Sequence, residues 1–285
     1  MIKEYHWDGE LEFEGEYLIG ERNGKGKEYF NGYLEYEGEY LNGKRNGKGK
    51  EYNWEGKLIF EGEYLNGKRN GKGKEYNLDR KLIFEGEYLY GFQLNGIYYV
   101  NKKLEFEGEY RYNKKWNGNG YDENGNIIYK LINGNGKIKE YDDKGNLIFK
   151  GEYINGKRNG KGKEYYENGK LKFEGEYLKG KRNGKGKKYY ENGKLKFEDE
   201  YLNNKRFGYG KEYYKIGKSK LRYESEYKNG KRNGKGKEYY NYGKFKLKYE
   251  GEYLNDTKNG RGKEYDNNGN IKFEGEYLNG KKILK

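Results

Sequence analysis

The stretch FEGEYLNGKRNGKGKEY, at Phe60–Tyr76, is the part of the sequence that decides the fold. It recurs as YEGEYLNGKRNGKGKEY at Tyr36–Tyr52 and as FEGEYLKGKRNGKGKKY at Phe173–Tyr189. In each copy two aromatic residues flank Glu-Gly-Glu, a turn-like segment follows, and Lys-Gly-Lys comes last. Both ends of the stretch alternate with a period of two residues, which is typical of β-strands.

The aromatic residue that precedes each Glu-x-Glu box marks a repeat unit. Such units follow one another along the whole chain at intervals of 20 to 26 residues. No linker or shift in composition divides them, so we expect one repeat domain over residues 1–285, with irregular units at about 84–148. The twelve markers are Phe13, Tyr36, Phe60, Phe84, Phe106, Tyr129, Phe149, Phe173, Phe197, Tyr223, Tyr249 and Phe273.

The composition agrees with a repeat β protein. Hydrophobic residues make up 32% and charged residues 38% of the 285-residue chain, and the mean hydropathy is −1.48, values that by themselves suggest disorder. Against disorder, the chain has 37 Tyr, 12 Phe and no Pro. We therefore expect a thin sheet with a core of aromatic rings rather than a thick aliphatic core.

Two kinds of turn connect the strands. Asn168-Gly169 separates two alternating runs, and we predict a two-residue type I′ hairpin turn there. Pairing outward from it places Tyr166 opposite Leu171, Lys163 opposite Glu174, Gly162 opposite Gly175, Lys161 opposite Glu176 and Gly160 opposite Tyr177. The register at the Leu-Asn-Gly-Lys-Arg turns stays open at this stage.

Hydrophobic patterning nevertheless fixes which residues share a face at those turns. Any register that keeps the rings on one side puts Phe60, Gly62 and Tyr64 with Gly71 and Gly73. The opposite face then carries Glu61, Glu63, Lys72 and Lys74, together with a Tyr from each Lys-Glu-Tyr box. We expect the rings to cover glycine backbone and the charges to form cross-strand ladders.

These patterns predict an all-β protein, an elongated single-layer antiparallel meander of about twelve hairpin repeats. At about 4.8 Å per strand, such a sheet would extend over about 110 Å.

The repeat resembles the MORN repeat family. The family pattern is an aromatic residue, x, Gly, x, a second aromatic residue, a short turn and Gly-x-Gly, as in Tyr36–Tyr52 and Phe60–Tyr76. The chain is also similar to bacterial MORN-variant proteins, some of them labelled antitoxin components. The resemblance implies a groove-bearing β-sheet that serves as a scaffold or adaptor, with self-association or membrane and phospholipid attachment in some members. It implies no catalytic residues.

Some units depart from the pattern. Unit six, at Tyr129–Gly136, has lost about four residues, and unit four lacks both the Lys-Arg pair and the second glycine. Asp199 and Ser225 replace the glycine of the Glu-Gly-Glu box. We expect the sheet to bend or bulge at these places.

The sequence contains no strong motif for catalysis, nucleotide binding or metal binding. Gly67-Lys-Arg-Asn-Gly-Lys lacks the glycine spacing and the Ser or Thr of a phosphate-binding loop. Glu61 and Glu63 recur in nearly every unit opposite lysines, which favours ion pairs over acid–base catalysis. His6 is the only histidine, and there is no cysteine. We expect no enzyme activity, no cofactor and no metal site.

Two sets of residues remain as candidate interaction sites. The first is a series of Lys-Arg pairs that fall in equivalent turns along one sheet edge and suit an anionic partner; it comprises Lys44, Arg45, Lys68, Arg69, Lys157, Arg158, Lys181, Arg182, Lys205, Arg206, Lys231 and Arg232. The second is an apolar stretch suited to protein contact; it comprises Leu89, Tyr90, Phe92, Leu94 and Ile97.

The sequence thus favours a scaffold or adaptor that binds a protein of unknown identity. Attachment to an anionic membrane is an alternative that the net charge of +14 supports, and an antitoxin-like role follows only from the resemblance. The rings repeat as partners of glycine, which disfavours nucleic acid as the ligand. Self-association through open sheet ends is a further expectation. Without a signal-peptide pattern, we expect a cytoplasmic protein, with peripheral membrane attachment as an option.

Overall fold

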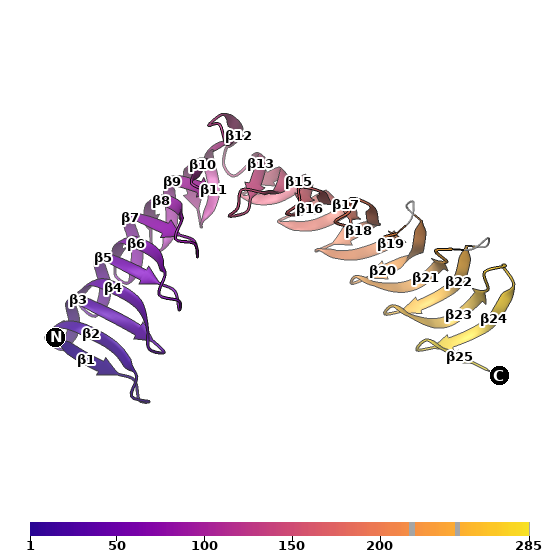
Figure 1. Cartoon of the computed structure of the whole chain (residues 1–285), viewed down its shortest axis with the longest axis horizontal. Coiled ribbons are helices and arrows are strands. Elements are labelled where there is room, and N and C mark those ends of the chain that lie inside the picture. Colours follow the sequence, from indigo (N-terminus) through magenta and orange to yellow (C-terminus); the bar gives the residue numbers. More distant parts are fainter. Residues whose placement is uncertain (217–219, 243–245, 285) are drawn as a thin grey trace. The chain divides into compact units, whose positions relative to one another are not determined.

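The computed structural model consists of β-strands joined by short turns (Figure 1). It describes residues 1–216, 220–242 and 246–284. The chain forms two compact units, Met1–Gly145 and Asn146–Lys285. In both units consecutive strands pair antiparallel in chain order, so the predicted all-β meander is confirmed.

The first unit contains a twelve-stranded sheet, β1 to β12, followed by β13. The strands are β1 (Ile2–Tyr5), β2 (Leu11–Leu18), β3 (Glu21–Phe30), β4 (Tyr33–Leu41), β5 (Lys44–Tyr52), β6 (Leu58–Leu65), β7 (Lys68–Tyr76), β8 (Leu82–Leu89), β9 (Phe92–Val100), β10 (Lys103–Arg111), β11 (Lys114–Tyr121), β12 (Ile127–Leu131) and β13 (Gly136–Tyr141).

The second unit continues the pattern. Its strands are β14 (Leu147–Ile154), β15 (Lys157–Tyr165), β16 (Leu171–Leu178), β17 (Lys181–Tyr189), β18 (Leu195–Leu202), β19 (Lys205–Tyr213), β20 (Leu221–Lys228), β21 (Lys231–Tyr239), β22 (Leu247–Leu254), β23 (Thr257–Tyr265), β24 (Ile271–Leu278) and β25 (Lys281–Ile283).

The ladder of the first sheet ends at β12, inside the region predicted to be irregular. β12 and β13 are short, and a single bridge between Ile132 and Asn135 closes their connection. Leu131 occupies the position that glycine has in a regular unit, and its buried side chain lies beside Gly136. The residues missing from unit six therefore coincide with the end of the regular pattern.

The predicted type I′ turn at Asn168-Gly169 is wrong. The Gly169 N–H donates to the Tyr166 carbonyl (2.9 Å), the Tyr166 N–H donates to the Lys170 carbonyl (2.9 Å), and only Gly169 has a positive φ in this loop. This is a three-residue loop with a glycine bulge. The bulge places Tyr165, not Tyr166, opposite Leu171, whereas the other four predicted pairs and their register are confirmed.

Type I′ geometry occurs instead at the Leu-Asn-Gly-Lys-Arg turns. Asn66 (φ 50°) and Gly67 (φ 81°) are both left-handed, and Leu65 pairs with Lys68. Farther from the turn the register shifts by two residues opposite Glu63, and Gly71 takes a φ of 94° there. A shift of two preserves the faces, so the predicted placement of Phe60, Gly62, Tyr64 and Gly73 on one face and of Glu61, Glu63, Lys72 and Lys74 on the other is confirmed. Gly71 differs, because a Cβ on this left-handed residue would meet the Glu63 side chain.

The core is a row of rings laid over glycine backbone. The Phe60 side chain is fully buried, and a Cβ on Gly73 would lie 2.5 Å from its Cζ atom. Phe60 makes edge-on contacts with Tyr64 and Tyr88, with centroids 5.7 and 5.2 Å apart, and such pairs contribute about 0.5–1.5 kcal/mol each beyond area burial. Because such contacts reach the next repeat, the rings join neighbouring hairpins.

Candidate functional site

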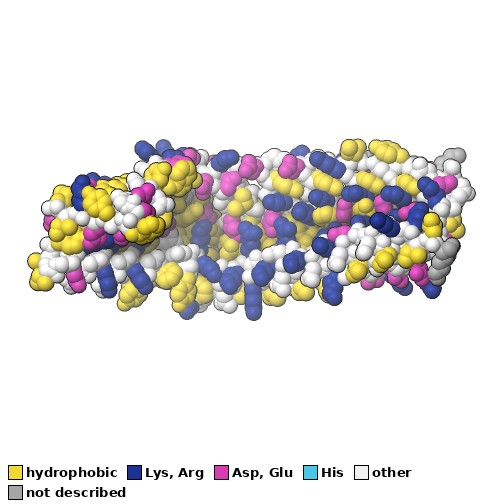
Figure 2. Space-filling model, turned by 90° about the horizontal axis from the view of Figure 1, so that it is seen from below, with side chains coloured by type: hydrophobic (Ala, Val, Ile, Leu, Met, Phe, Trp, Pro, Cys, Tyr) yellow, Lys and Arg dark blue, Asp and Glu magenta, His cyan; other side chains and the backbone are white. Residues whose placement is uncertain are grey.

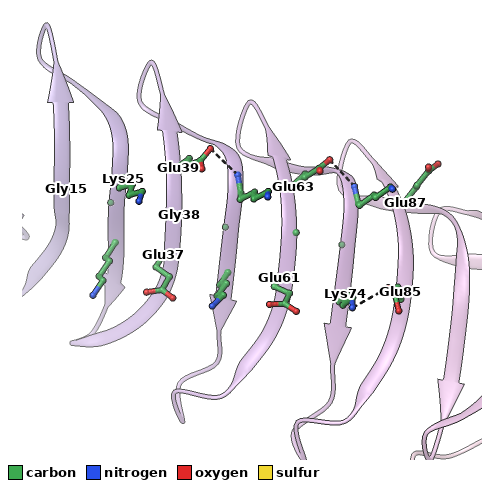
Figure 3. Close-up of a pocket in the computed structure, with 18 of the residues that line it drawn as sticks. Gly15, Lys25, Glu37, Gly38, Glu39, Glu61, Glu63, Lys74, Glu85 and Glu87 are labelled. Atoms are coloured by element: carbon green, nitrogen blue, oxygen red, sulfur yellow. Dashed lines mark hydrogen bonds and ion pairs between the residues drawn. The ribbon is translucent and has the colours of Figure 1, made fainter.

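A groove runs across β2 to β8 on the face opposite the rings (Figure 3). Its volume is about 900 Å³. Glycine backbone forms its floor, and the rings cover the same glycines on the far side. The floor glycines are Gly15, Gly26, Gly38, Gly49, Gly62, Gly73 and Gly86.

Two rows of charged side chains flank this floor. Each Glu-Gly-Glu strand supplies one glutamate to either row, and each Lys-Gly-Lys strand supplies one lysine to either row, so the signs alternate from strand to strand (Figure 3). Lys74 lies 3.3 Å from Glu85 across the strands. The lining holds seven glutamates and six lysines, so the groove is close to neutral although the chain carries +14.

Tyrosines of the Lys-Glu-Tyr boxes hold one glutamate row in place. The Tyr76 hydroxyl donates to Glu61 (2.6 Å), and the Tyr29 hydroxyl donates to Glu14 (2.8 Å). Burial and this hydrogen bond raise the pKa of Tyr29 to about 12. The tyrosines therefore remain neutral donors over the physiological range and fix the position of the carboxylates.

The alternation of charge ends at β9. Asn95 and Ile97 occupy the positions of the two lysines, and the Asn95 amide donates to Glu87 (2.9 Å). A second groove of about 990 Å³ lies in the second unit, where Tyr209 stands at a lysine position. Each unit thus has its own groove.

The structure separates the two residues of each predicted Lys-Arg pair. The lysines are exposed in the turns: Lys44, Lys68, Lys157, Lys181, Lys205 and Lys231. The arginines lie half-buried on the ring face, each 4.0–4.3 Å from the centroid of the first ring of its unit: Arg45, Arg69, Arg158, Arg182, Arg206 and Arg232. Within each unit, only the lysines of these pairs therefore lie exposed along the turn edge.

Arg69 shows what these arginines do. Its guanidinium lies over Phe60, donates to Glu75 (2.9 Å) and pairs with Glu51 of the preceding repeat. The Tyr64 hydroxyl also donates to Glu51 (2.7 Å). Burial alone would raise the pKa of Glu51, but the pairing with Arg69 lowers it below the usual value. The arginine thus joins repeats on the ring face.

The predicted apolar contact residues are also divided between two surfaces. Leu89, Tyr90, Phe92 and Leu94 are exposed near the β8–β9 turn, at 41–65% of their full accessibility, and Phe92 packs edge-on against Tyr112 (5.5 Å). Ile97 instead is half-buried and pairs with Glu85 and Glu107 on the groove face. Their role in protein contact stays a prediction.

A buried ion pair at a glycine position escaped the sequence reasoning. Asp199, at a glycine position, buries its carboxylate 2.7 Å from the Arg206 Nε, and Arg206 also lies over Phe197 and Tyr227. Burial raises the pKa of Asp199 to about 6, although Arg206 opposes the shift. The register shift of this hairpin falls at Asp199 itself. In the sequence, the only sign of this ion pair was that Asp199 replaces a glycine of the repeat.

Among the described residues, no group of three or more His, Asp and Glu side chains could hold a metal ion. The described part of the chain also contains no helix that could cross a membrane.

Comparison with known proteins agrees with the repeat geometry. The MORN repeat model matches residues 13–33, 36–53, 60–77, 149–170, 173–194, 200–219, 223–244 and 249–271, more than half of the chain. No curated protein matches.

Solved structures give only remote similarity. Crystal structures of TcdB2-TccC3 without its hypervariable C-terminal region and of TcdB2-TccC3-TEV are 12% and 10% identical. They match over 98% and 95% of this chain, with TM-scores of 0.19 and 0.22. This chain spans less than a fifth of either protein, covering 18% and 16% of them. The repeats matched along the sequence and the ring-over-glycine hairpins lead to one conclusion: the chain belongs to the MORN repeat family.

Proposed function

We propose that this protein is a non-enzymatic repeat scaffold that binds a protein partner along the groove of the first unit. The observation that supports this role is a bare glycine floor between two rows of alternating charges. Such a surface offers a shape and a charge pattern that a partner can recognise, but no group of side chains arranged for catalysis. MORN repeats are generally found in proteins that mediate protein or membrane interactions, which agrees with this role.

The groove suggests the chemistry of the partner. Strands whose groove side chains carry the same charge recur at every second position in the sheet, about 10 Å apart. A partner that lies along the groove would therefore carry charges of alternating sign on both flanks and small or apolar groups against the floor. Because the groove is nearly neutral overall, this complementarity would contribute specificity more than raw affinity.

A pair of matched variants tests the proposal. Lys48→Glu with Lys72→Glu changes exposed groove lysines, and Lys44→Glu with Lys68→Glu changes exposed lysines of the turn edge by the same charge. Purified wild type and both variants serve as bait in a pull-down from the native source, read by mass spectrometry. We expect the specific partners to be lost only with the groove variant; retention of all of them would contradict groove binding.

Attachment to anionic membranes is a second candidate, which the exposed turn lysines support, two of them in the first unit and four in the second. Each lysine near an anionic surface can contribute about 1 kcal/mol. Co-sedimentation with phosphatidylserine-containing vesicles, at low and at physiological salt, should detect binding that Lys44→Glu with Lys68→Glu weakens. An absence of binding at both salt concentrations would reject this role.

A further inference from the structure

One position on the ring face carries a lysine where other repeats carry a glutamate. In other strands the residue at this position is Glu28, Glu51, Glu75, Glu164, Glu212, Glu238 or Glu264. In β17 it is Lys188, which pairs with Phe173 of β16 and with Phe197 of β18. The pairing is the same as that of Glu51 with Phe60 in the first unit. Lys188 therefore changes the charge of the ring face without changing its register.

The glutamate at this position accepts contacts from three kinds of neighbour. Glu164 accepts hydrogen bonds from the Tyr177 hydroxyl (2.6 Å) and from the Arg182 guanidinium (2.5 Å). Glu212 pairs with Arg222, which occupies the bulge of β20 (3.1 Å). A tyrosine hydroxyl, an arginine and a cation at the bulge thus share the acceptor oxygens of one carboxylate. A lysine at this position supplies none of them.

Tyr201 is the tyrosine that corresponds to Tyr177 in the repeat of Lys188. Its ring packs edge-on against Phe173 (5.2 Å), the residue that pairs with Lys188. Tyr201 is 6% exposed, and its hydroxyl has no hydrogen-bond partner among the described residues. The Tyr253 hydroxyl is unpaired as well, but its acceptor position still holds a glutamate. At Tyr201 the repeat supplies no acceptor there, so a buried hydroxyl is left unsatisfied.

The two cations that would share the glutamate are affected differently. Arg206 pairs instead with Asp199, which lies 2.7 Å from its Nε atom. Lys196 occupies the bulge of β18, the place that Arg222 has in β20. Within the described residues no carboxylate lies at ion-pair distance from Lys196. The buried aspartate therefore replaces the lost glutamate for Arg206 but not for Lys196.

Three half-buried lysines gather at this place. Basic and acidic side chains lie interspersed over the second unit in the view of Figure 2, whereas Lys172 and Lys196, at the bulges of β16 and β18, lie on either side of Lys188. Burial lowers the pKa of Lys188, and the charges of both lysines and of Arg182 lower it further. The cluster thus has an excess of positive charge that a bound anion would offset.

We propose that this lysine cluster, Lys172, Lys188 and Lys196, binds a phosphate monoester, with the Tyr201 hydroxyl as a further donor. A phosphate monoester brings nearly two negative charges and three acceptor oxygens, and lysine binds such groups as a point charge. A carboxylate offers one charge and two oxygens, so it matches three cations less well. The site lies on the ring face of the second unit, so it is independent of the groove of the first unit and of the exposed turn lysines.

Titration calorimetry of the full-length chain with O-phosphoserine tests the site. At about pH 7.5 the phosphate is mostly dianionic, and we expect a dissociation constant below about 1 mM. Acetate at the same ionic strength should bind at least about tenfold more weakly, because it carries a single charge. A peptide containing phosphoserine should bind like the free amino acid. No binding of phosphoserine, affinity equal to that of acetate, or binding only to vesicles that contain phosphatidic acid would overturn the proposal.

Lys188→Glu restores the residue of the other repeats and is the decisive variant. It should abolish phosphoserine binding and keep or raise the thermal midpoint, because Tyr201 and Lys196 regain a carboxylate partner. The control, Lys181→Glu, makes the same change of charge at an exposed position of the same strand and should bind like wild type. Equal affinity of Lys188→Glu and wild type would refute the assignment, and circular dichroism verifies that both variants are folded.

A second pair of variants tests the hydroxyl. Tyr201→Phe removes an unpaired hydroxyl, so it should leave the thermal midpoint unchanged and weaken phosphoserine binding by about three- to tenfold. Tyr177→Phe removes a hydroxyl that donates to Glu164, so it should lower the midpoint and leave binding unchanged. Undiminished binding by Tyr201→Phe would contradict the role of this hydroxyl as a donor.

Discussion

Glycine is the residue on which each repeat depends. A side chain on Gly73 would meet the Phe60 ring at 2.5 Å and also approach Tyr88 at 3.1 Å. On the other face the backbone of the same glycine forms part of the groove floor. Glycine is therefore required for the ring core, whereas the alternation of side chains along the strand leaves this position bare on the groove face.

Replacing Gly73 with Ala should consequently destabilise the first unit. We expect a loss of about 2 kcal/mol, because the new methyl group forces the buried Phe60 ring out of position. The midpoint of urea unfolding, followed by circular dichroism, measures it. Lys72→Ala, an exposed neighbour on the same strand, is the control and should shift stability by less than about 0.5 kcal/mol. Similar midpoints for both variants would show that ring packing tolerates the methyl group.

Two departures from the regular repeat show how the ring face accommodates a buried acid. At Asp199 the repeat accepts a carboxylate because Arg206 already lies nearby over Phe197. At β10, Glu105 bulges onto the ring face and pairs with Lys115, while Tyr129 donates to the same carboxylate (2.7 Å). In both cases the buried acid lies next to a cation, which avoids the high free-energy cost of an unpaired buried charge.

At the scale of the hairpin, two similar sequences form different turns. Asn66 is left-handed at the first position of a type I′ turn, whereas Asn168 lies in a three-residue loop in which only Gly169 is left-handed. Both turns contain Asn-Gly followed by Lys. The dipeptide therefore does not decide the turn type. At Asn168 the bulge places Tyr165 opposite Leu171, while the rest of the register is the one that a two-residue turn would give.

The turn types predict opposite effects of Ala and Gly. The Asn66→Ala variant should be less stable than the Asn66→Gly variant, because a non-glycine residue is strained at positive φ. The Asn168→Gly variant should be less stable than the Asn168→Ala variant, because glycine adds conformational freedom to the unfolded chain. Each difference should be about 1 kcal/mol. Thermal unfolding of the four single variants measures the order, and the same order at both sites would contradict the assigned turns.

The sequence predicted the strands but not all of the contacts between their side chains. Period-two alternation and the Glu–Lys matches identified the strands, the two faces and most of the register, as in the pairing of Gly162 with Gly175. Alternation also puts Arg69, two residues before Gly71, on the ring face, but the sequence reasoning did not use this, and which residue Arg69 faces depends on a two-residue shift near the turn. Such a shift preserves alternation and therefore leaves no trace in a periodic pattern.

Across the whole molecule, many cations serve the fold rather than a ligand. The arginines of the Lys-Arg pairs stack on rings, and several of them also join carboxylates of neighbouring repeats, as Arg182 does with Glu164. The groove is nearly neutral. Net charge alone is therefore a poor guide to partner choice here, and the distribution of exposed and unpaired lysines is the more informative property.

The abundance of buried tyrosine makes alkaline stability the test of the ring core as a whole. Burial is the main cause that raises the pKa to about 12 at Tyr201, Tyr227 and Tyr249, against about 10 in an unfolded chain. Above pH 10 the unfolded chain therefore binds fewer protons than the folded one, so stability falls as the pH rises toward the folded-state pKa values.

We accordingly expect base-induced unfolding between about pH 10 and 12 in which tyrosine ionisation and loss of β-structure occur together. Absorbance at the tyrosinate band reports the 37 tyrosines separately from the lysines, which titrate over the same range, and circular dichroism reports the strands. The exposed tyrosines should ionise first and the remainder only as the strands unfold. Ionisation of every tyrosine near pH 10 with an unchanged β-sheet spectrum would show that the rings do not form the buried row on which this fold depends.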